Sequence, residues 1–323
     1  MSLRSGYQAD FLGGGFEIDV PKPGLALEGD VLQPPGLPQG EVVVPYINYS
    51  LVMSKSTRQA LYSAANVNND PQKVHQVSGS KGRRWFIDDR VGRDNQLPNY
   101  SYQGSMWDRG HLTRRTAVTW GDSLAIATAA SNDSCAYTNA CMQHKNFNED
   151  EWRAVELLVS EFKVATRITV FTGPVFTITD RFFIKQFGDD PVRIPAAFWK
   201  TVSYVAADNA LHTEAYIFFQ DVPSIRSSKA RGHLRIKNMQ VTTTELSLWT
   251  GLVFPQVMYD SNLLKFYSGP ERISTKRHKE LLKKDPDTLQ LEAGITGENA
   301  ISAARTSFPL EDFYELIDEI SWV

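Results

Sequence analysis

Two stretches decide the interpretation of this chain: Asp108-Arg109-Gly110-His111, and the later run Asn148-Glu149-Asp150-Glu151-Trp152-Arg153-Ala154-Val155-Glu156. Histidine can act as a general base near neutral pH, and arginine presents paired donors to phosphate oxygens. Asparagine and glutamate supply oxygen atoms of the kind that a hard metal ion prefers. Together these side chains are the parts needed to hydrolyse a phosphodiester.

The spacing of Asn148, Trp152 and Glu156 is that of one helix face. The three residues stand at i, i+4 and i+8, so in a helix that begins at Asn148 they form one stripe. Trp152 would anchor this helix in the core, because a tryptophan buries a large apolar area. The competing interpretation is a plain helix start, since Asn148 is a good N-cap and acidic residues 149–151 fill the first turn.

Neither stretch is specific alone, because residues 108–111 could equally form a surface turn. As an ordered set, however, they resemble the DNA/RNA non-specific endonucleases, the ββα-metal nucleases of the Serratia and endonuclease G type. Asp108 to His111 match the family's Asp-Arg-Gly-His. The family's Asn-x-x-Pro-Gln…Asn-x-x-x-Trp-x-x-x-Glu is matched at unchanged spacing by Asn139, Gln143, Asn148, Trp152 and Glu156.

The resemblance extends over about residues 6 to 255 and includes three weaker segments, at residues 6–12, 172–176 and 194–200. Two positions depart from the family pattern. Met142 replaces the proline before Gln143, which we expect to alter only a turn. Ser160 stands where some relatives have an arginine one turn beyond the glutamate, so that arginine's role is not transferred.

This resemblance implies an α+β protein with the ββα-metal (His-Me finger) nuclease fold, a mixed or antiparallel sheet and flanking helices. His111 is the expected general base, because its ordinary pKa lies near 6.5 and it can accept a proton from an attacking water. Its other ring nitrogen would donate to a backbone carbonyl. Arg109 is expected to bind the substrate phosphate and to stabilise the charge of the transition state.

The metal expected at such a site is Mg²⁺, with Mn²⁺ able to substitute. Asn148 would bind the ion directly through its amide oxygen, because Mg²⁺ keeps several waters and few protein ligands. Glu156 and Asp108 are expected to act through water. Asn139, Gln143 and Trp152 are expected to support the site.

A second phosphate-binding arginine is predicted at Arg83. The pattern Arg-x-Trp-x-x-Asp, which runs from Arg83 to Asp88, resembles the family segment that brings such an arginine to the site. Three further arginines are expected to be flanking contacts to nucleic acid or solvated charges: Arg84, Arg114 and Arg115.

The formal net charge of −3 and the pI of about 6.1 argue against a protein that coats nucleic acid with a broad basic surface. An enzyme needs only a local basic cleft. Lysine and arginine do cluster, and the candidates to line such a cleft are residues 81–93, 109–115 and 226–237. For the last cluster, scattered solvated charge is at least as good an explanation.

Cys135 and Cys141 are the two cysteines. A short-loop disulfide is one alternative, but free thiols are favoured because secreted disulfide frameworks use more cysteines. Residues 1–30 show no apolar signal region and no run reaches transmembrane length, so no membrane partner is expected. Localisation stays open, since a removed leader would leave no trace.

The 323 residues, 42% of them hydrophobic, suffice for a substantial core. We expect an extended, Pro- and Gly-rich arm over residues 1–45, an endonuclease domain over 46–266 and a helical extension packed on the core over 267–323. Strands are predicted at 46–53, 60–65, 168–172, 198–206 and 212–219. Helices are predicted at 122–130, 148–162, 242–250 and 276–284, with an apolar helical pattern at 310–320.

The function expected from the resemblance is metal-dependent, sequence-non-specific hydrolysis of DNA and RNA that leaves 5′-phosphate ends. Two alternatives stay open: a nucleic-acid-binding protein of the same fold that has lost catalysis, and a nuclease toxin with a cognate inhibitor. A homodimer and a protein inhibitor are also left open as partners.

Overall fold

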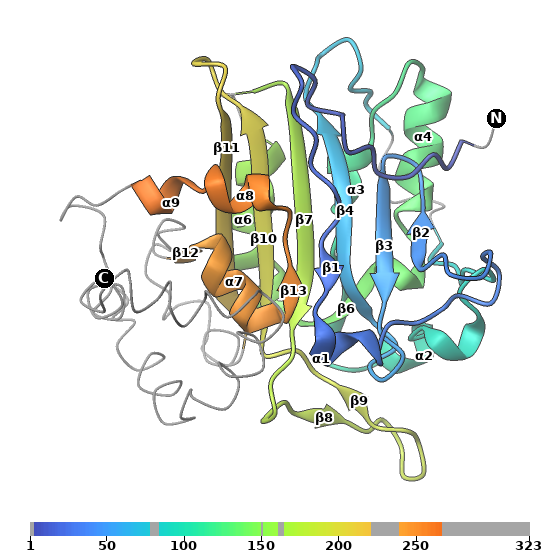
Figure 1. Ribbon diagram of the computed structural model, residues 1–323. Helices are drawn as coiled ribbons and strands as arrows, with labels where there is room; N and C mark the ends of the chain where they lie inside the picture. Colours follow the sequence, from blue (N-terminus) through green and yellow to red (C-terminus); the bar gives the residue numbers. More distant parts are fainter. Residues whose placement is uncertain (1–2, 78–83, 150, 161–164, 221–238, 267–323) are drawn as a thin grey trace, which may run out of the picture.

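A seven-stranded antiparallel sheet forms the centre of the protein in the computed structural model, which describes residues 3–77, 84–149, 151–160, 165–220 and 239–266 (Figure 1). The predicted α+β class is confirmed, and every strand pair of this sheet is antiparallel. In spatial order the strands are β12 (Gln240–Val241), β11 (Leu211–Phe219), β10 (Ala197–Val205), β7 (Arg167–Val175), β4 (Ala60–Asn68), β3 (Tyr49–Met53) and β2 (Val43–Pro45).

Both faces of this sheet are covered, and successive residues of a strand therefore enter two separate apolar layers. In β10, Phe198 belongs to one layer and Trp199 to the other, and both side chains are fully buried. Strands β7 and β10 are buried along nearly their whole length for the same reason. A lysine in such a strand, Lys200, is therefore buried as well.

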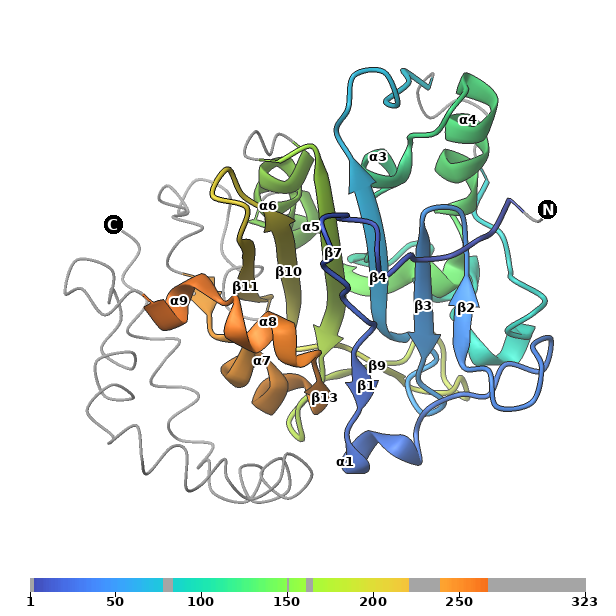
Figure 2. The same cartoon turned by 45° about the horizontal axis from the view of Figure 1, so that its top comes forward.

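One face is covered by segments from the two ends of the described chain (Figures 1 and 2). Strand β1 pairs with β13, with Lys22 opposite Val253, so the N-terminal segment runs beside the last elements. This layer contains β1 (Lys22–Pro23), α1 (Leu25–Glu28), α7 (Thr243–Thr250), β13 (Leu252–Val253), α8 (Gln256–Asp260) and α9 (Leu263–Phe266). Its core is built around Ile18, Trp199 and Leu246.

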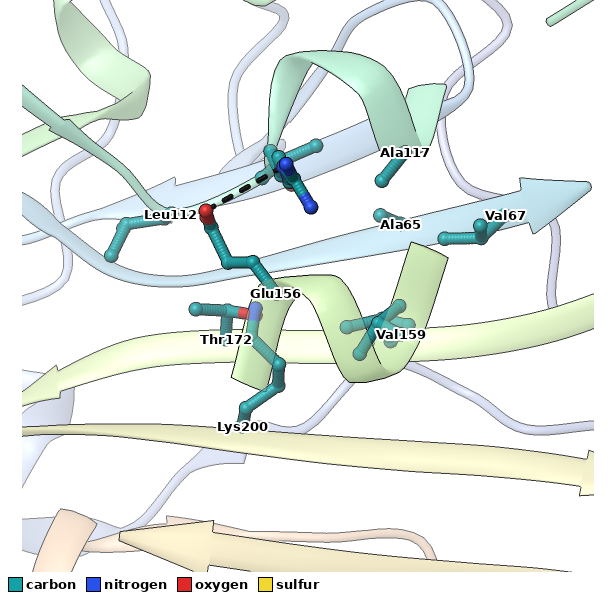
Figure 3. A pocket seen from close by; sticks show the side chains of 11 residues that line it. Ala65, Val67, Leu112, Ala117, Glu156, Val159, Thr172 and Lys200 are labelled. Atoms are coloured by element: carbon teal, nitrogen blue, oxygen red, sulfur yellow. Dashed lines mark hydrogen bonds and ion pairs between the residues drawn. The ribbon is translucent and has the colours of Figure 1, made fainter. Parts of the chain in front are cut away.

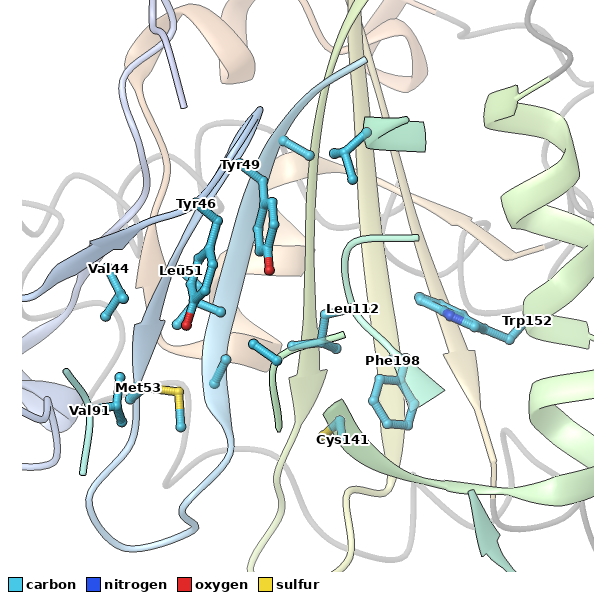
Figure 4. Close-up of a cluster of buried hydrophobic side chains, with 14 of the residues drawn as sticks. Val44, Tyr46, Tyr49, Leu51, Met53, Val91, Leu112, Cys141, Trp152 and Phe198 are labelled. Carbon is cyan, nitrogen blue, oxygen red and sulfur yellow. The ribbon is translucent and has the colours of Figure 1, made fainter. Parts of the chain in front are cut away.

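The opposite face carries the helices and the hairpin that hold the candidate site. These elements are β5 (Trp107–His111), α3 (Arg115–Val118), α4 (Leu124–Asp133), β6 (Ala140–His144), α5 (Lys145–Glu149) and α6 (Glu151–Ser160). Figure 4 shows the core beneath them, where Tyr46 stacks on Tyr49 with ring centroids 4.7 Å apart. Trp152 lies against Phe198 at 5.5 Å, which joins helix α6 to strand β10.

Smaller elements surround the hairpin. They are η1 (Arg93–Asn95), α2 (Asn99–Tyr102), η2 (Tyr137–Asn139), β8 (Phe182–Phe183) and β9 (Val192–Arg193). Strands β8 and β9 form a hairpin that projects from one end of the sheet (Figure 1). Within the described ranges, no helix is both long enough and apolar enough to span a membrane.

Most predicted elements within these ranges are confirmed, with shifted ends. The helix expected at 122–130 is α4, which begins later because the Ser123 side chain caps it at the amide of Ile126. Helix α7 has a capping box between Thr242 and Glu245. The predicted strand at 46–53 is wrong at its start, since Asn48 has φ of 68° in the turn between β2 and β3.

Several predicted segments lie outside the described residues: the helices at 276–284 and 310–320, the extension over 267–323 and the basic cluster at 226–237.

Candidate active site

Asp108 to His111 form a strand, β5, and not the surface turn that was the alternative interpretation. Strand β5 pairs antiparallel with β6, with Asp108 opposite Gln143 and His111 opposite Ala140. The chain leaves β6 at His144 and enters α5 at Lys145 without a loop. A two-stranded hairpin followed directly by a helix is therefore the scaffold of the site.

Met142 also lies in strand β6, so the expectation that it alters only a turn is wrong. Its side chain is fully buried, and its backbone N–H donates to Oε1 of Gln59 at 2.9 Å. A proline has no N–H and could not make this bond. Methionine at this position thus ties the hairpin to the start of strand β4, next to Gln59.

His111, the predicted general base, ends strand β5 beside Trp85. The two rings are 4.6 Å apart between centroids and are tilted by 45°. The same tryptophan accepts the guanidinium of Arg109 over its ring at 5.4 Å. Trp85 therefore contacts both predicted catalytic side chains.

The guanidinium of Arg109 is also oriented by α2. Its Nη1 atom donates to Oδ1 of Asn99 at 3.0 Å. A guanidinium has five N–H donors, so one bond to Asn99 leaves capacity for a phosphate. Asn99 was not identified from the sequence, and only its position at the start of α2 indicates a structural role.

Asn148 lies inside helix α5, so the predicted helix start at Asn148 is wrong. The helix begins three residues earlier, at Lys145, where the His144 ring nitrogen Nδ1 accepts the amide of Asn146 at 3.2 Å. Asn148 uses its amide for a tertiary contact and not for a cap: Nδ2 donates to Oδ2 of Asp108 at 3.0 Å. Two predicted site residues are thus in direct contact.

Glu156 lies on α6, a separate helix from the α5 that carries Asn148, and its side chain is only 12% exposed. Nε of Arg114 approaches its Oε2 atom at 3.6 Å. Burial raises the pKa of the Glu156 carboxyl, and the charges of Lys200, Arg114 and Arg153 oppose that rise. The sequence predicts Arg114 as a flanking contact or a solvated charge, whereas in the structure it forms an ion pair with a predicted site residue.

Lys200 is a charged residue whose place near the site the sequence did not indicate. It is 3% exposed, and its Nζ atom donates to Oγ1 of Thr172 at 2.7 Å. Figure 3 shows Lys200 and Thr172 below Glu156 in a small pocket between α6 and the sheet. Burial lowers the pKa of the Lys200 ammonium, while the nearby Glu156 carboxylate raises it.

The three predicted supporting residues have different surroundings. Asn139 is fully buried and holds the loop after His111, accepting from the Thr113 amide at 2.9 Å and donating to the Thr113 and Ser134 carbonyls. Gln143 packs directly on Gly110. Trp152 is fully buried and carries the Lys200 ammonium over its ring at 4.8 Å.

Arg83 lies outside the described residues, so its predicted phosphate contact stays a prediction. The rest of its motif is described and well anchored. Asp88 is buried and accepts from Arg90 Nη2 at 2.7 Å and from the Tyr46 hydroxyl at 2.5 Å. This anchor fixes the segment that places Trp85 beside His111.

Both cysteines are buried thiols, and no disulfide joins Cys135 to Cys141, as the sequence favoured. Burial raises the pKa of the Cys141 thiol well above its ordinary value, so it is unreactive at neutral pH. The cysteines therefore belong to the core and not to the site.

The donor atoms at this site suit a hard cation. The Nδ2 atom of Asn148 is taken by Asp108, and Oδ1, on the other branch of the amide, accepts from no described residue. Neutral amide and carboxylate oxygens are ligands of Mg²⁺ or Ca²⁺ and are poor ligands for zinc. The described part of the chain contains no cluster of three His, Cys, Asp or Glu side chains that would form a closed metal cage.

A histidine on the first strand of a hairpin, and an asparagine on the helix that follows, define the ββα-metal class of nuclease folds. Comparison with known proteins agrees with this class. The family model of the DNA/RNA non-specific endonucleases matches residues 30–261. The chain therefore belongs to this family, whose members are metal-dependent nucleases.

The relatives differ in how much of their length the chain matches. The uncharacterized protein y4fB of Sinorhizobium fredii is 27% identical over 83% of this chain, but the chain spans only 41% of that protein. Mitochondrial endonuclease G of Bos taurus is 23% identical over 71% of the chain and 75% of its own length. The human enzyme is 23% identical over 68% and 71%.

Among solved structures, the complex of EndoG with EndoGI contains a similar fold. The match has a TM-score of 0.54 and 19% identity, and it covers 68% of this chain and 87% of that one. This likeness supports the same arrangement of sheet, hairpin and helix.

Proposed function

We propose that this protein is a metal-dependent endonuclease that hydrolyses the phosphodiester bonds of DNA and RNA with little sequence preference. The observation that carries the proposal is the hydrogen bond from Asn148 to Asp108, because it joins the helix with the expected metal ligand to the strand that carries His111. The family membership of the chain supports the same activity.

His111 acts as the general base in this proposal. It removes a proton from the attacking water, and Trp85 holds its ring in place. Arg109 binds the phosphate that is attacked and stabilises the negative charge that builds up on its oxygens. The Asn99 contact restricts the guanidinium to that direction.

Asn148 would hold Mg²⁺, or Mn²⁺ in its place, through Oδ1, while Asp108 and Glu156 orient water around it. When bound, the ion supplies a positive charge that polarises the phosphate and stabilises the leaving 3′-oxygen. The products then carry 5′-phosphate and 3′-hydroxyl ends. Contacts to the backbone read no base code, which accounts for the expected lack of sequence preference.

Incubation of supercoiled plasmid and of a structured RNA with Mg²⁺, and separately with EDTA, tests the proposal. Cleavage of both substrates only with metal, lost in His111→Ala, is the expected result. Ligation of the products with and without kinase treatment identifies their 5′ ends. A gel shift of intact substrate in every lane would instead support the nucleic-acid-binding protein without catalysis.

The partners of the chain stay predictions. The fold is similar to EndoG in the EndoG/EndoGI complex, which is described as a mechanism of EndoG inhibition. A protein inhibitor of this chain is proposed by analogy with that complex alone. A homodimer is tested by light scattering of the purified chain.

A further inference from the structure

We infer that Lys200 is a positioning residue, which fixes the Glu156 carboxylate from the sheet side of helix α6 without touching the substrate. The inference rests on the proposed function, in which Glu156 orients water at the site. It concerns a residue in the middle of strand β10, on the layer that supports the site.

The Lys200 ammonium contacts a hydroxyl group and an aromatic ring. Nζ donates to the Thr172 hydroxyl at 2.7 Å and lies 4.8 Å from the centre of the Trp152 ring. A hydroxyl and an aromatic face stabilise the ammonium but leave its charge uncompensated. Because burying an unpaired charge is costly, a counter-charge is needed nearby.

Glu156 is that counter-charge. The pocket between α6 and strands β4, β7 and β10 is lined by described residues, of which Glu156 is the single acid and Arg114 and Lys200 are the bases (Figure 3). The remaining lining residues are apolar or hydroxyl-bearing: Ala65, Val67, Leu112, Thr113, Ala117, Val159, Val170 and Thr172. In such surroundings the attraction between Lys200 and Glu156 is weakly screened.

The two cations have different environments. The Arg114 side chain is 23% exposed and approaches Oε2 of Glu156 at 3.6 Å, a distance at which water competes for the carboxylate. Lys200 is almost completely enclosed and belongs to the rigid sheet. Lys200 is therefore the fixed partner, and Arg114 is the partner that solvent and substrate can displace.

Lys200 contacts helix α6 at Trp152 and lines the same pocket as Glu156. The ammonium lies over the Trp152 ring, and Glu156 follows one turn later on the same face. One buried cation therefore faces both Trp152, which packs in the core, and Glu156, which is assigned to the site. In the shared pocket the charge of Lys200 favours one orientation of the Glu156 carboxylate, and a carboxylate that holds water needs such a defined geometry.

A double-mutant cycle between Lys200→Met and Glu156→Gln separates this role from a general contribution to folding. Methionine keeps the length and apolar stem of lysine but removes the charge. We expect Lys200→Met to lower the single-turnover rate by about 10- to 100-fold, as is typical for loss of an outer-shell partner, with half-saturating DNA changed less than about 3-fold. In the Glu156→Gln background the same substitution should change the rate by less than about 3-fold.

Metal affinity gives a readout besides activity. Titration of Mn²⁺ followed by electron paramagnetic resonance should show binding about 10-fold weaker in Lys200→Met than in the parent. Lys22→Met is the matched control, because Lys22 is an exposed lysine in β1 on the opposite face of the sheet. It should leave both the rate and the Mn²⁺ affinity unchanged.

Thr172→Val provides a second route if Lys200→Met fails to fold by circular dichroism. It removes the acceptor of Nζ while it keeps the charge and shape of the pocket. A rate loss of about 3- to 10-fold that disappears in the Glu156→Gln background is expected.

The inference would be overturned if Lys200→Met, or Thr172→Val where only that variant folds, lowered the rate equally with Glu156 and with Gln at position 156. It would also be overturned if that variant kept the rate and the Mn²⁺ affinity of the parent. Absence of metal-dependent cleavage by the parent would overturn the proposed function instead.

Discussion

The Nδ2 atom of Asn148 donates a hydrogen bond to Oδ2 of Asp108 at 3.0 Å, which joins helix α5 to strand β5. A carboxylate only accepts hydrogen bonds, so this contact determines which amide atom of Asn148 faces Asp108. The carbonyl oxygen Oδ1 is directed elsewhere. Asp108 therefore leaves the Asn148 oxygen available for the metal-binding role proposed above.

The roles proposed for His111 and Asn148 predict different failures. His111→Ala should retain Mg²⁺ and nucleic-acid binding but lose on the order of 10² to 10⁴ in rate, because it removes the general base. Asn148→Ala should weaken metal affinity, so part of its loss should be recovered at high Mg²⁺ or with Mn²⁺. Single-turnover cleavage against metal concentration measures both.

The same titration can reject these assignments. If added metal restores His111→Ala and leaves Asn148→Ala inactive, the two roles are reversed. Parent-like cleavage by both variants would place the active site elsewhere in the chain.

A second prediction concerns the close approach of Gln143 to Gly110. A methyl group at position 110 would lie 1.9 Å from Oε1 of Gln143 and 2.4 Å from its Cγ. Gly110→Ala should therefore displace one strand of the hairpin and lower the free energy of unfolding by about 1–3 kcal/mol. Urea unfolding and the cleavage rate should both report the change.

Gln143→Ala is the matched partner for this test, because it removes the atoms that the new methyl would meet. The double variant should recover most of the stability that Gly110→Ala loses. Additive losses in the double variant would mean that another contact of Gly110 is responsible.

A helix near Asn148 was predictable from the local spacing of Asn148, Trp152 and Glu156, and β-branched and aromatic runs located long strands of the sheet. The strand that carries His111 was not assigned from the sequence, because residues 108–111 were equally compatible with a surface turn. The start of the helix at Asn148 was not predictable. The side-chain amide of Asn148 bonds to its tertiary partner Asp108. The His144 ring nitrogen accepts the backbone amide of Asn146 at the start of the helix, so Asn148 is not needed as a cap.

Lys200 and Arg114 show a second limit. A lysine in a strand normally reaches solvent, and nothing local to β10 shows that helix α6 covers this position. Arg114 follows the Asp108–His111 motif closely, but its ion pair with Glu156 spans two separate segments. The sequence shows that a residue is charged, but the fold decides which residue of opposite charge lies next to it.

A third prediction follows from the anchor at Asp88. Burial by itself would raise the pKa of Asp88, but hydrogen bonds from Arg90 and Tyr46 hold it below the ordinary value. The stability that ionised Asp88 contributes is therefore fully present above about pH 4 and is lost as the pH falls through the lower pKa of the folded state. Asp88→Asn should lack this contribution.

At pH 7 we expect Asp88→Asn to lower the free energy of unfolding by about 1.5–3 kcal/mol, as for hydrogen bonds to a charged group. Urea unfolding at a series of pH values should show the gap to the parent closing below about pH 4. A gap that stays constant down to pH 2 would contradict the low pKa of Asp88. Asp89→Asn, at the exposed neighbouring carboxylate, serves as the control.

The last prediction tests whether Trp152 acts through packing. Its side chain is fully buried against Phe147 at 5.9 Å, Phe198 at 5.5 Å and Phe218 at 6.2 Å between ring centroids. Trp152→Ala should cost about 3–5 kcal/mol of unfolding free energy, since it leaves a cavity beneath α6. Trp152→Phe should cost less and keep most of the cleavage rate per folded molecule, because a smaller aromatic ring still fills much of that space. Trp249→Phe, in the opposite layer against Phe219, is the matched control and should leave the rate unchanged. Thermal unfolding combined with single-turnover cleavage at low temperature separates the two effects: a Trp152→Phe variant that is as stable as the parent but inactive would show that the indole takes part in the chemistry.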